Sequence, residues 1–154
     1  MPSFTVTAIG RVSCARREAI DDAWDSVPSQ ITLDAAVLGP DALSGLEAFS
    51  HVEVIYLFDQ VGEDEVVTGA RHPRGRADWP RVGILAQRGK NRPNRIGATI
   101  CRIVGVEGRV LRVSGLDAID GTPVIDIKPV MSGFLPRGDV REPDWALEIM
   151  KHYW

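Results

Sequence analysis

Short segments in which apolar and polar residues alternate recur along most of the chain, and this pattern constrains its fold more than any other feature. Alternation with many β-branched residues is typical of half-buried strands. The segments fall at residues 4–12, 29–38, 50–58, 81–87, 97–108 and 109–116. They do not alternate with helix-length segments, which argues against a parallel sheet with crossover helices. The sequence therefore predicts a mainly β fold, built as an antiparallel sheet or barrel.

Turn and helix signals complete this outline. Gly108 lies between the last two segments and predicts a hairpin there. Asp120-Gly121 is the strongest two-residue hairpin signal in the chain. A short helical turn is expected at 39–49, and residues 141–154 show the one clear helical pattern. The expected fold thus contains one or two short helices, the clearer of them C-terminal.

Size and composition limit the possible classes of protein. The 154 residues suit one domain spanning 1–154. We expect a cytoplasmic protein, because the sequence shows neither a basic, apolar leader nor an apolar run of membrane-spanning length. Cys14 and Cys101 are far apart in sequence and are expected to be reduced thiols. No histidine has the spacing of a metal site, so metal catalysis has no support. The sequence also contains no glycine-rich phosphate loop.

Positive charge is concentrated in residues 71–95. This segment holds eight of the 18 Lys and Arg residues and one of the 21 acids, Asp78, in a chain of net charge −3. A local cluster of cations is typical of an anion-binding surface. The alternative is a solvated loop whose cations pair with acids elsewhere, and charge alone does not decide between the two.

The stretch "ARHPRGRADWPRVG" (70–83) contains too much proline and glycine for a regular element. Arginine side chains on such a loop, among them Arg71 and Arg74, can hold phosphates in bidentate fashion. Trp79 could stack on a base, or it could fill the edge of the core. Both interpretations remain open from the sequence.

The stretch "RGKNRPNRIG" (88–97) predicts a turn from which Arg88, Arg92 and Arg95 project. Gly97 would let the following strand approach a ligand closely, since glycine has no Cβ. Loops positioned by strands commonly carry function, which mildly favours a binding role over a turn that happens to be basic.

The stretch "SGLDAIDGTPVIDIKP" (114–129) ends in a candidate strand at 123–129. In that strand Val124, Asp126 and Lys128 are expected to share one face. An aspartate beside a lysine can hold an ionised base, or the two can form an exposed ion pair of little consequence. Asp120 can likewise be a base or simply the first residue of its Asp-Gly turn.

Four stretches together resemble one known family. They read "SGLEAFSHVEVIYLF", "RHPRG", "VGILAQRGKNRPNRIG" and "LDAIDGTPVIDIKP", in the order found in the TsaA-like (TrmO) family of S-adenosylmethionine-dependent tRNA methyltransferases. The resemblance implies a single-sheet β-barrel, S-adenosylmethionine as cofactor, and a homodimer with the cofactor near the subunit interface. It also implies methylation of the exocyclic amine of threonylcarbamoyladenosine beside the anticodon of tRNA. Longer members carry an additional C-terminal domain, which we do not expect in this chain.

The resemblance further implies site residues where the motifs match. Cofactor contacts are implied at Gln60, Arg88, Ala98, Ser114, Gly115, Leu116 and Asp117, and, by distance from the first strand alone, at Asp25 and Ser26. Chemistry rather than a family motif suggests the substrate contacts, with Arg71, Arg74 and Arg92 to hold phosphates and Asn94 to orient the base or ligand. An adenosine amine is a poor nucleophile, so a base that takes its proton is useful. The catalytic candidates are Asp126, Asp120 and Lys128.

The chain differs from many members of this family at Asp59, where they have histidine, and at Arg95, where they have proline. Two other functions stay open. One is a methyltransferase of the same fold that acts on a small molecule or another RNA. The other is a non-catalytic protein that binds S-adenosylmethionine.

Overall fold

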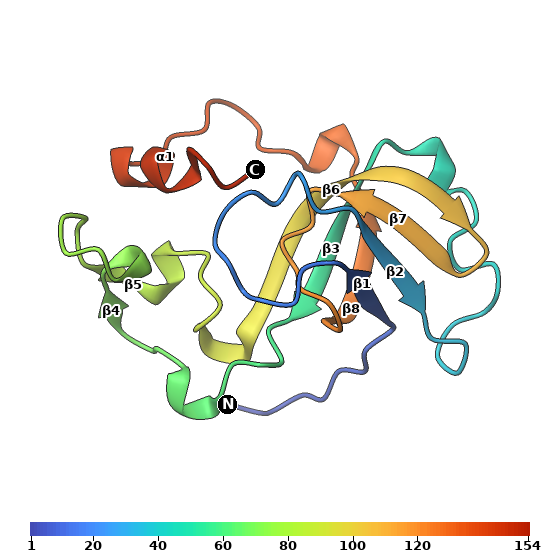
Figure 1. Ribbon diagram of the computed structural model, residues 1–154, viewed down its shortest axis with the longest axis horizontal. Coiled ribbons are helices and arrows are strands. Elements are labelled where there is room, and N and C mark those ends of the chain that lie inside the picture. Colours follow the sequence, from blue (N-terminus) through green and yellow to red (C-terminus); the bar gives the residue numbers. More distant parts are fainter.

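The computed structural model describes residues 1–154, and its centre is a closed barrel of six antiparallel strands (Figure 1). The order around the barrel is β1-β2-β7-β6-β3-β8, and β8 closes the barrel by pairing with β1. The strands are β1 Gly10–Cys14, β2 Ser29–Leu33, β3 His51–Leu57, β6 Ile96–Glu107, β7 Val110–Ser114 and β8 Pro123–Pro129. Closure leaves no unpaired sheet edge. The predicted mainly β barrel is therefore confirmed.

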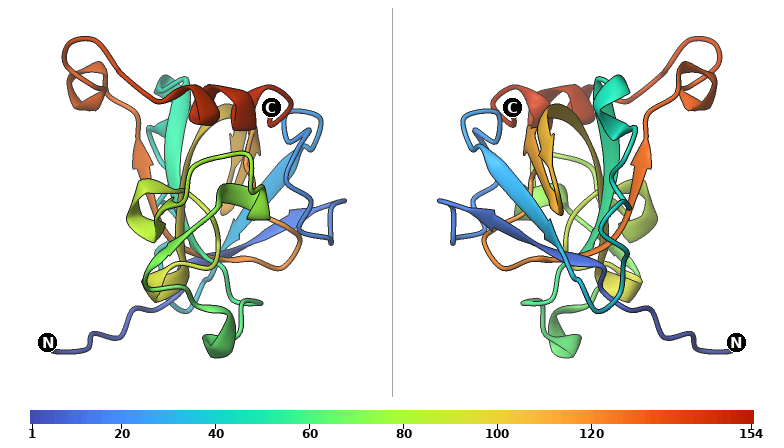
Figure 2. Two further views of the ribbon diagram at one scale, coloured as in Figure 1. Left: turned by 90° about the vertical axis from the view of Figure 1, so that its left-hand side faces the viewer. Right: turned by 90° about the vertical axis from the view of Figure 1, so that its right-hand side faces the viewer.

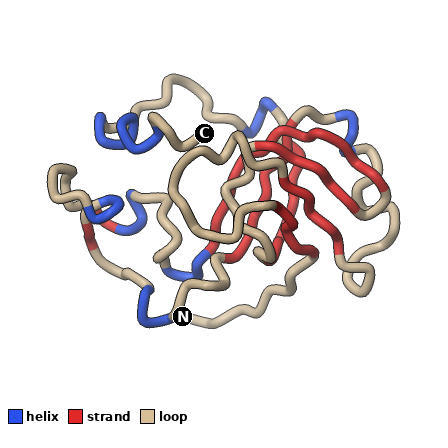
Figure 3. Tube along the Cα trace, in the orientation of Figure 1, coloured by secondary structure: helices blue, strands red, loops and turns tan.

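The remaining elements are short and lie around the barrel (Figure 3). A two-stranded sheet joins β4 Ala70–Arg71 to β5 Val82–Gly83. Single 3₁₀ turns occupy Leu46–Ala48, Glu63–Glu65, Pro73–Gly75, Ile84–Ala86, Pro93–Arg95 and Ser132–Phe134. The α-helix α1 spans Asp144–Met150, inside the segment where the sequence predicts a helix. No helix in the structure has the length and apolar character needed to cross a membrane.

The barrel interior is filled by the inward side chains of its own strands. On β3 the residues Val52, Val54 and Tyr56 point inward, and they belong to a cluster of 13 buried apolar residues. Gly97 on β6 lies directly against this core, because a Cβ atom built there would stand 2.5 Å from the Tyr56 ring. The close approach expected at Gly97 is thus to the protein's own tyrosine and not to a ligand.

Two expected strands prove shorter than their alternating patterns. The first begins at Gly10 rather than at residue 4, because the preceding segment has no strand to pair with, and Phe4 is 85% exposed. The second ends at Leu33 rather than at residue 38. There the carboxylate of Asp34 accepts a hydrogen bond from the amide of Ala36 at 2.8 Å, which turns the chain.

The expected strand at 81–87 is mostly wrong. Only Val82 and Gly83 are in strand conformation, and the chain then enters the 3₁₀ turn Ile84–Ala86. This segment lies outside the barrel, where its one partner is the two-residue strand β4. Without a longer partner the ladder of backbone hydrogen bonds cannot continue.

Of the two expected hairpins one is confirmed and one is wrong. β6 and β7 pair around Gly108, with Glu107 opposite Val110. The Asp120-Gly121 turn joins β7 to β8, but these strands do not pair with each other. The turn is attached to β1 instead, because the amide of Gly121 donates to the carbonyl of Val12 at 2.9 Å. The turn thus bonds to β1 and does not bring β7 and β8 together as a hairpin.

A β-bulge changes which residues of β8 share a face. The register against β3 shifts between Ile55 and Tyr56, so Ile125 is the extra residue. Val124 is fully buried, whereas Asp126 and Lys128 are outside the barrel. The expectation that Val124 shares a face with Asp126 is therefore wrong, while the pairing of Asp126 with Lys128 is observed.

Candidate functional site

A pocket of about 380 Å³ lies beside the end of β7, between the barrel wall and the segment that follows α1. Its lining comprises Asp25, His51, Ile100, Arg102, Ser114, Gly115 and Trp154. Its volume is in the range of about 300–1,000 Å³ that is usual for small-molecule sites. The structure therefore brings together three residues that the sequence assigns to a cofactor, Asp25, Ser114 and Gly115, from two separate segments.

The turn at Gly115 needs the absence of a side chain. Gly115 has a φ of 75°, and a Cβ atom there would lie 3.2 Å from the Oδ1 atom of Asp25. Ser26 shapes the loop that carries Asp25, since its hydroxyl donates to the carbonyl of Ala23 at 2.9 Å. Leu116 is completely buried in the core. Only the backbone of Leu116 can thus contribute to a neighbouring ligand site.

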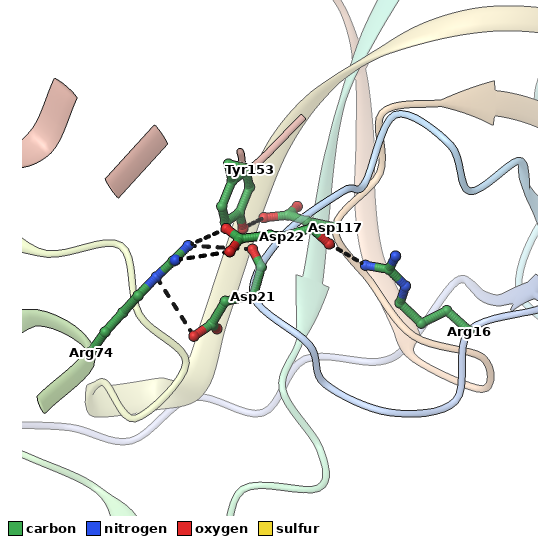
Figure 4. Close-up of polar contacts among 6 residues, drawn as sticks. All are labelled: Arg16, Asp21, Asp22, Arg74, Asp117 and Tyr153. Carbon is green, nitrogen blue, oxygen red and sulfur yellow. Dashed lines mark hydrogen bonds and ion pairs between the residues drawn. The ribbon is translucent and has the colours of Figure 1, made fainter. Parts of the chain in front are cut away.

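Next to this turn the carboxylate of Asp117 accepts hydrogen bonds from three hydroxyl groups. The donors are Tyr56, at 2.7 Å, together with Thr99 and Tyr153. Burial first, and then the negative charge of Asp117, raises the pKa of both tyrosines well above the usual range. The tyrosines therefore remain neutral donors and hold Asp117 in one orientation. Figure 4 shows the Tyr153 contact.

The outer positions of β6 connect the pocket to further predicted residues. Arg88 donates to the backbone carbonyl of Ala98. Ala98 precedes Ile100, a pocket residue, by two positions on the same outer face of β6. Gln60 is different, because it lies in an exposed stretch after β3 and does not line the pocket. Arg88 and Ala98 do not line the pocket either, but Ala98 lies two positions along β6 from the lining residue Ile100.

The outer barrel wall also connects this region to Asp126. Ile55 on β3 pairs with Ala98 on one side and with Asp126 on the other. Neighbouring strands are about 4.8 Å apart, so Ala98 and Asp126 are separated by roughly 10 Å across the sheet surface. Lys128 forms an ion pair with Asp126. That carboxylate, and next the charge of Glu53, raises the pKa of Lys128.

Asp120, the other candidate base, has a different position. Its carboxylate accepts a hydrogen bond from the amide of Cys14 at 3.2 Å and lies 3.9 Å from the guanidinium of Arg17. It borders a second pocket of about 480 Å³ with these two residues. Asp120 therefore does not join Asp25 and Gly115 in the first pocket. Of the two carboxylates, Asp126 shares its row of the sheet with the implied cofactor residue Ala98.

The cations of residues 71–95 divide into two groups. Arg74 forms ion pairs with Asp22 at 2.8 Å and with Asp21 at 3.6 Å (Figure 4), and Arg76 pairs with Asp78. The other six cations of this segment form no ion pair. The interpretation of this segment as a loop whose cations pair with acids thus holds for Arg74 and Arg76. The remaining cations leave a positive surface.

The other implied substrate residues stand within this segment. Arg71 donates to the side chains of Gln87 and Asn91 at 3.4 and 3.3 Å. Arg92 donates to the carbonyl of Gln87 at 2.9 Å, while Asn94 is exposed in a turn with a φ of 63°. Arg71 and Arg92 therefore also fix the shape of the loops that carry them.

Trp79 does not offer its ring to a base. It is 6% exposed, its indole nitrogen donates to Glu148 of α1 at 2.7 Å, and the guanidinium of Arg76 covers its ring at 4.1 Å. Trp79 thus fills the edge of the core, and the stacking interpretation is wrong.

Several residues around the pocket were not expected from the sequence. His51 and Arg102 stand opposite each other on β3 and β6, which only the strand register reveals. Tyr153 and Trp154 reach the site from the far end of the chain. No spacing or motif in the sequence identifies Tyr153 or Trp154 as a site residue, because their role depends on where the segment after α1 lies.

Comparisons with known proteins show which family the chain is similar to. The family model "tRNA-methyltransferase O N-terminal domain" matches residues 21–134. The chain is 36% identical over 113 residues, 72% of its length, to the Homo sapiens "tRNA (adenine(37)-N6)-methyltransferase", and spans 25% of that protein. It is 35% identical over 148 residues, 90% of its length, to the Pseudomonas aeruginosa "Putative S-adenosylmethionine-dependent methyltransferase RcsF", and spans 58% of it.

The fold is also similar to a solved structure. The crystal structure of TrmO from Pseudomonas aeruginosa superposes with a TM-score of 0.72 at 29% identity. The match covers 91% of this chain and 62% of that one. The chain thus spans less than two thirds of the length of these relatives.

Proposed function

Since the chain belongs to the tRNA-methyltransferase O family through its N-terminal domain, we propose that it is an S-adenosylmethionine-dependent methyltransferase that acts on tRNA. The proposed acceptor is the exocyclic amine of threonylcarbamoyladenosine next to the anticodon. The observation that carries this proposal is the pocket at the end of β7, where Asp25, Ser114 and Gly115 meet. All three are among the residues that the resemblance implies for the cofactor, Ser114 and Gly115 through a motif and Asp25 through its distance from the first strand alone.

The residues of this pocket suit S-adenosylmethionine. The cofactor carries two positive groups, one carboxylate and two ribose hydroxyls. Asp25 supplies an anion, and Arg102 supplies a cation in the same pocket. At Gly115 the space that a Cβ atom would fill stays open next to Asp25. When bound, the cofactor supplies a methyl group activated by a positively charged sulfur.

The chain's own residues would then bind and orient the two reactants. Asp117 and its three hydroxyl donors keep the Ser114–Asp117 turn rigid, which favours a fixed donor geometry. We assign the base to Asp126, which would take the proton of the amine as its new bond forms. Lys128 would hold that carboxylate in place through their ion pair. The unpaired cations of residues 71–95 would hold tRNA phosphates.

We also propose a homodimer that forms over β6. Three apolar side chains stand exposed in a row on the outer face of this strand, Ile96, Ile100 and Val104. Ile100 borders the pocket as well, so a partner subunit on β6 would lie next to the cofactor. Because tRNA is the proposed acceptor, the compartment that we expect is the cytoplasm.

The test is methyl transfer from radiolabelled S-adenosylmethionine to total tRNA. One tRNA pool comes from cells that make threonylcarbamoyladenosine and the other from cells that cannot. We expect label only in the first pool. Binding of the cofactor without label in either pool would refute the tRNA activity. The alternatives would then be a small-molecule acceptor or a protein that only binds S-adenosylmethionine.

A further inference from the structure

The segment after α1 is attached to the loop that carries Asp25. The amide of Ala23 donates to the carbonyl of His152 at 2.8 Å, and the amide of Trp24 donates to the carbonyl of Tyr153 at 2.9 Å. Figure 2 shows the C-terminal segment lying beside this loop, at one end of the barrel. Two consecutive backbone hydrogen bonds fix the position of residues 152–153 relative to the pocket wall.

Helix α1 and the segment after it are held at two other points. Glu148 of α1 accepts the hydrogen bond of the buried Trp79 indole. The guanidinium of Arg74, which pairs with Asp21 and Asp22, lies 5.9 Å from the centre of the Tyr153 ring (Figure 4). Contacts to three separate parts of the chain therefore give residues 144–154 one defined position.

Tyr153 then reaches into the site. Its hydroxyl donates to Oδ2 of Asp117, while the hydroxyl of Tyr56 donates to Oδ1 at 2.7 Å. Asp117 follows Gly115 by two residues, so its orientation affects the turn that borders the pocket. Removal of the Tyr153 hydroxyl would leave Oδ2 without this partner.

Trp154 forms part of the pocket itself. Its ring packs edge-on against Tyr153, with centroids 5.0 Å apart, and it remains 45% exposed. Besides Ile100 it is the one large apolar residue among the lining residues, and the one aromatic ring apart from His51. The pocket thus has a charged side and an aromatic side, as an amino acid joined to a purine nucleoside requires.

We propose that Trp154 is a cofactor-contacting residue that covers the purine end of S-adenosylmethionine, and that Tyr153 is a positioning residue that acts through Asp117. Both lie outside residues 21–134, the part that the family model matches. This inference rests on the proposed function, because the proposed function supplies the identity of the cofactor. It adds that the barrel binds the cofactor fully only with residues 144–154 in place.

The test is calorimetric titration of the purified chain with S-adenosylhomocysteine, the stable product. We expect Trp154→Ala to weaken binding about tenfold or more, the usual effect of losing an aromatic stack on a base. Trp154→Phe should restore most of the affinity. Leu147→Ala, a change of an exposed residue in the same segment, is the matched control and should bind as the parent chain does.

Fluorescence gives a second readout that a purely structural role would not change. Addition of the ligand should alter the tryptophan emission of the parent chain, and this change should be largely lost in Trp154→Phe. Tyr153→Phe keeps the ring and should weaken binding several-fold without loss of the fold. Unaltered affinity in both Trp154→Ala and Tyr153→Phe would overturn the proposal.

The two proposals fail in different ways. Tight ligand binding by the parent chain without methylation of tRNA contradicts only the tRNA activity, and the comparison of variants still stands. A parent chain that binds neither S-adenosylmethionine nor S-adenosylhomocysteine contradicts both proposals.

Discussion

Gly97 illustrates how a single residue can determine the packing of the barrel. Its lack of a side chain lets the Tyr56 ring lie flat against β6, and Tyr56 in turn donates to Asp117 beside the pocket. The absence of a side chain at Gly97 therefore affects both the core and the site.

We expect Gly97→Ala to lower the free energy of unfolding by about 1–3 kcal/mol, the usual cost of overpacking a core. The added methyl group would stand 2.5 Å from the Tyr56 ring, so the ring or the strand must move. Gly105→Ala is the matched control in the same strand, because the nearest atom to a Cβ built at Gly105 is 4.0 Å away. Urea denaturation of both variants measures the difference, and equal losses would contradict the prediction.

The buried thiol of Cys101 predicts how stability changes with pH. Burial, and then the charge of Asp117, raises the pKa of this thiol from 9.0 to about 12. Between these values the unfolded chain loses the thiol proton while the folded chain keeps it. The contribution to stability is therefore complete below pH 9 and is lost as the pH rises towards 12.

The measurement is urea denaturation at increasing pH. The free energy of unfolding should fall above pH 9, and Cys101→Ala should reduce the slope of this fall. Cys14→Ala is the control at the half-buried thiol. If the slope of Cys101→Ala equals that of the parent chain, the thiol does not titrate as described.

At the scale of elements, the bulge in β8 decides which side chains face outward. If β8 had no bulge at Ile125, strict alternation would place Val124 and Asp126 on the same side of the sheet. With it, Asp126 and Lys128 stand outside, in the rows that contain Ala98 and Ile100. The departure from strict alternation at Ile125 thus leaves a carboxylate on the same wall as the pocket.

We expect Asp126→Asn to lower methyl transfer to tRNA by about 10²–10⁴, the usual contribution of a general base. Affinity for S-adenosylmethionine should not change, because Asp126 does not line the pocket. Asp120→Asn is the comparison, and it should keep most of the activity. Single-turnover rates for the two variants decide between the carboxylates, and the opposite order would assign the base to Asp120.

Strands that pair over most of their length could be predicted from alternation, among them β3, β6 and β7. Alternation reports which side of a strand is buried, but it does not report whether a partner strand exists. Residues 4–8 and 85–87 alternate without a partner strand and are not strands. Asp25, Ser114 and Gly115, which the resemblance implies as cofactor contacts, line one pocket. His51, Arg102 and Trp154 were not expected from the sequence, because only register and the path of the last segment place them there.

At the scale of the whole molecule, charge is distributed unevenly. The chain as a whole has a net charge of −3, yet six cations of residues 71–95 have no acidic partner. A polyanion is therefore attracted to one region and repelled by the others, which favours one orientation of binding.

Salt dependence tests this surface. Lys90 is exposed and unpaired, so we expect Lys90→Ala to weaken tRNA binding and to reduce the slope of log affinity against log salt by about 1. Arg137→Ala, which removes an exposed cation outside the segment, should leave that slope unchanged. Filter binding over a range of salt concentrations measures both. A common slope for the two variants would contradict a localised phosphate site.

The barrel interior is filled by its own side chains, and the candidate site lies on its outer wall. Most buried side chains therefore lie apart from the outer rows, while Tyr56 reaches the site through Asp117. Volume-conserving replacements among Val52, Val54 and Leu111 can accumulate without altering which acceptor is chosen. Replacements along the outward rows of β3, β6 and β8 can redirect the chemistry without unfolding the protein. We therefore expect the choice of acceptor to vary more readily than the fold in a barrel of this kind.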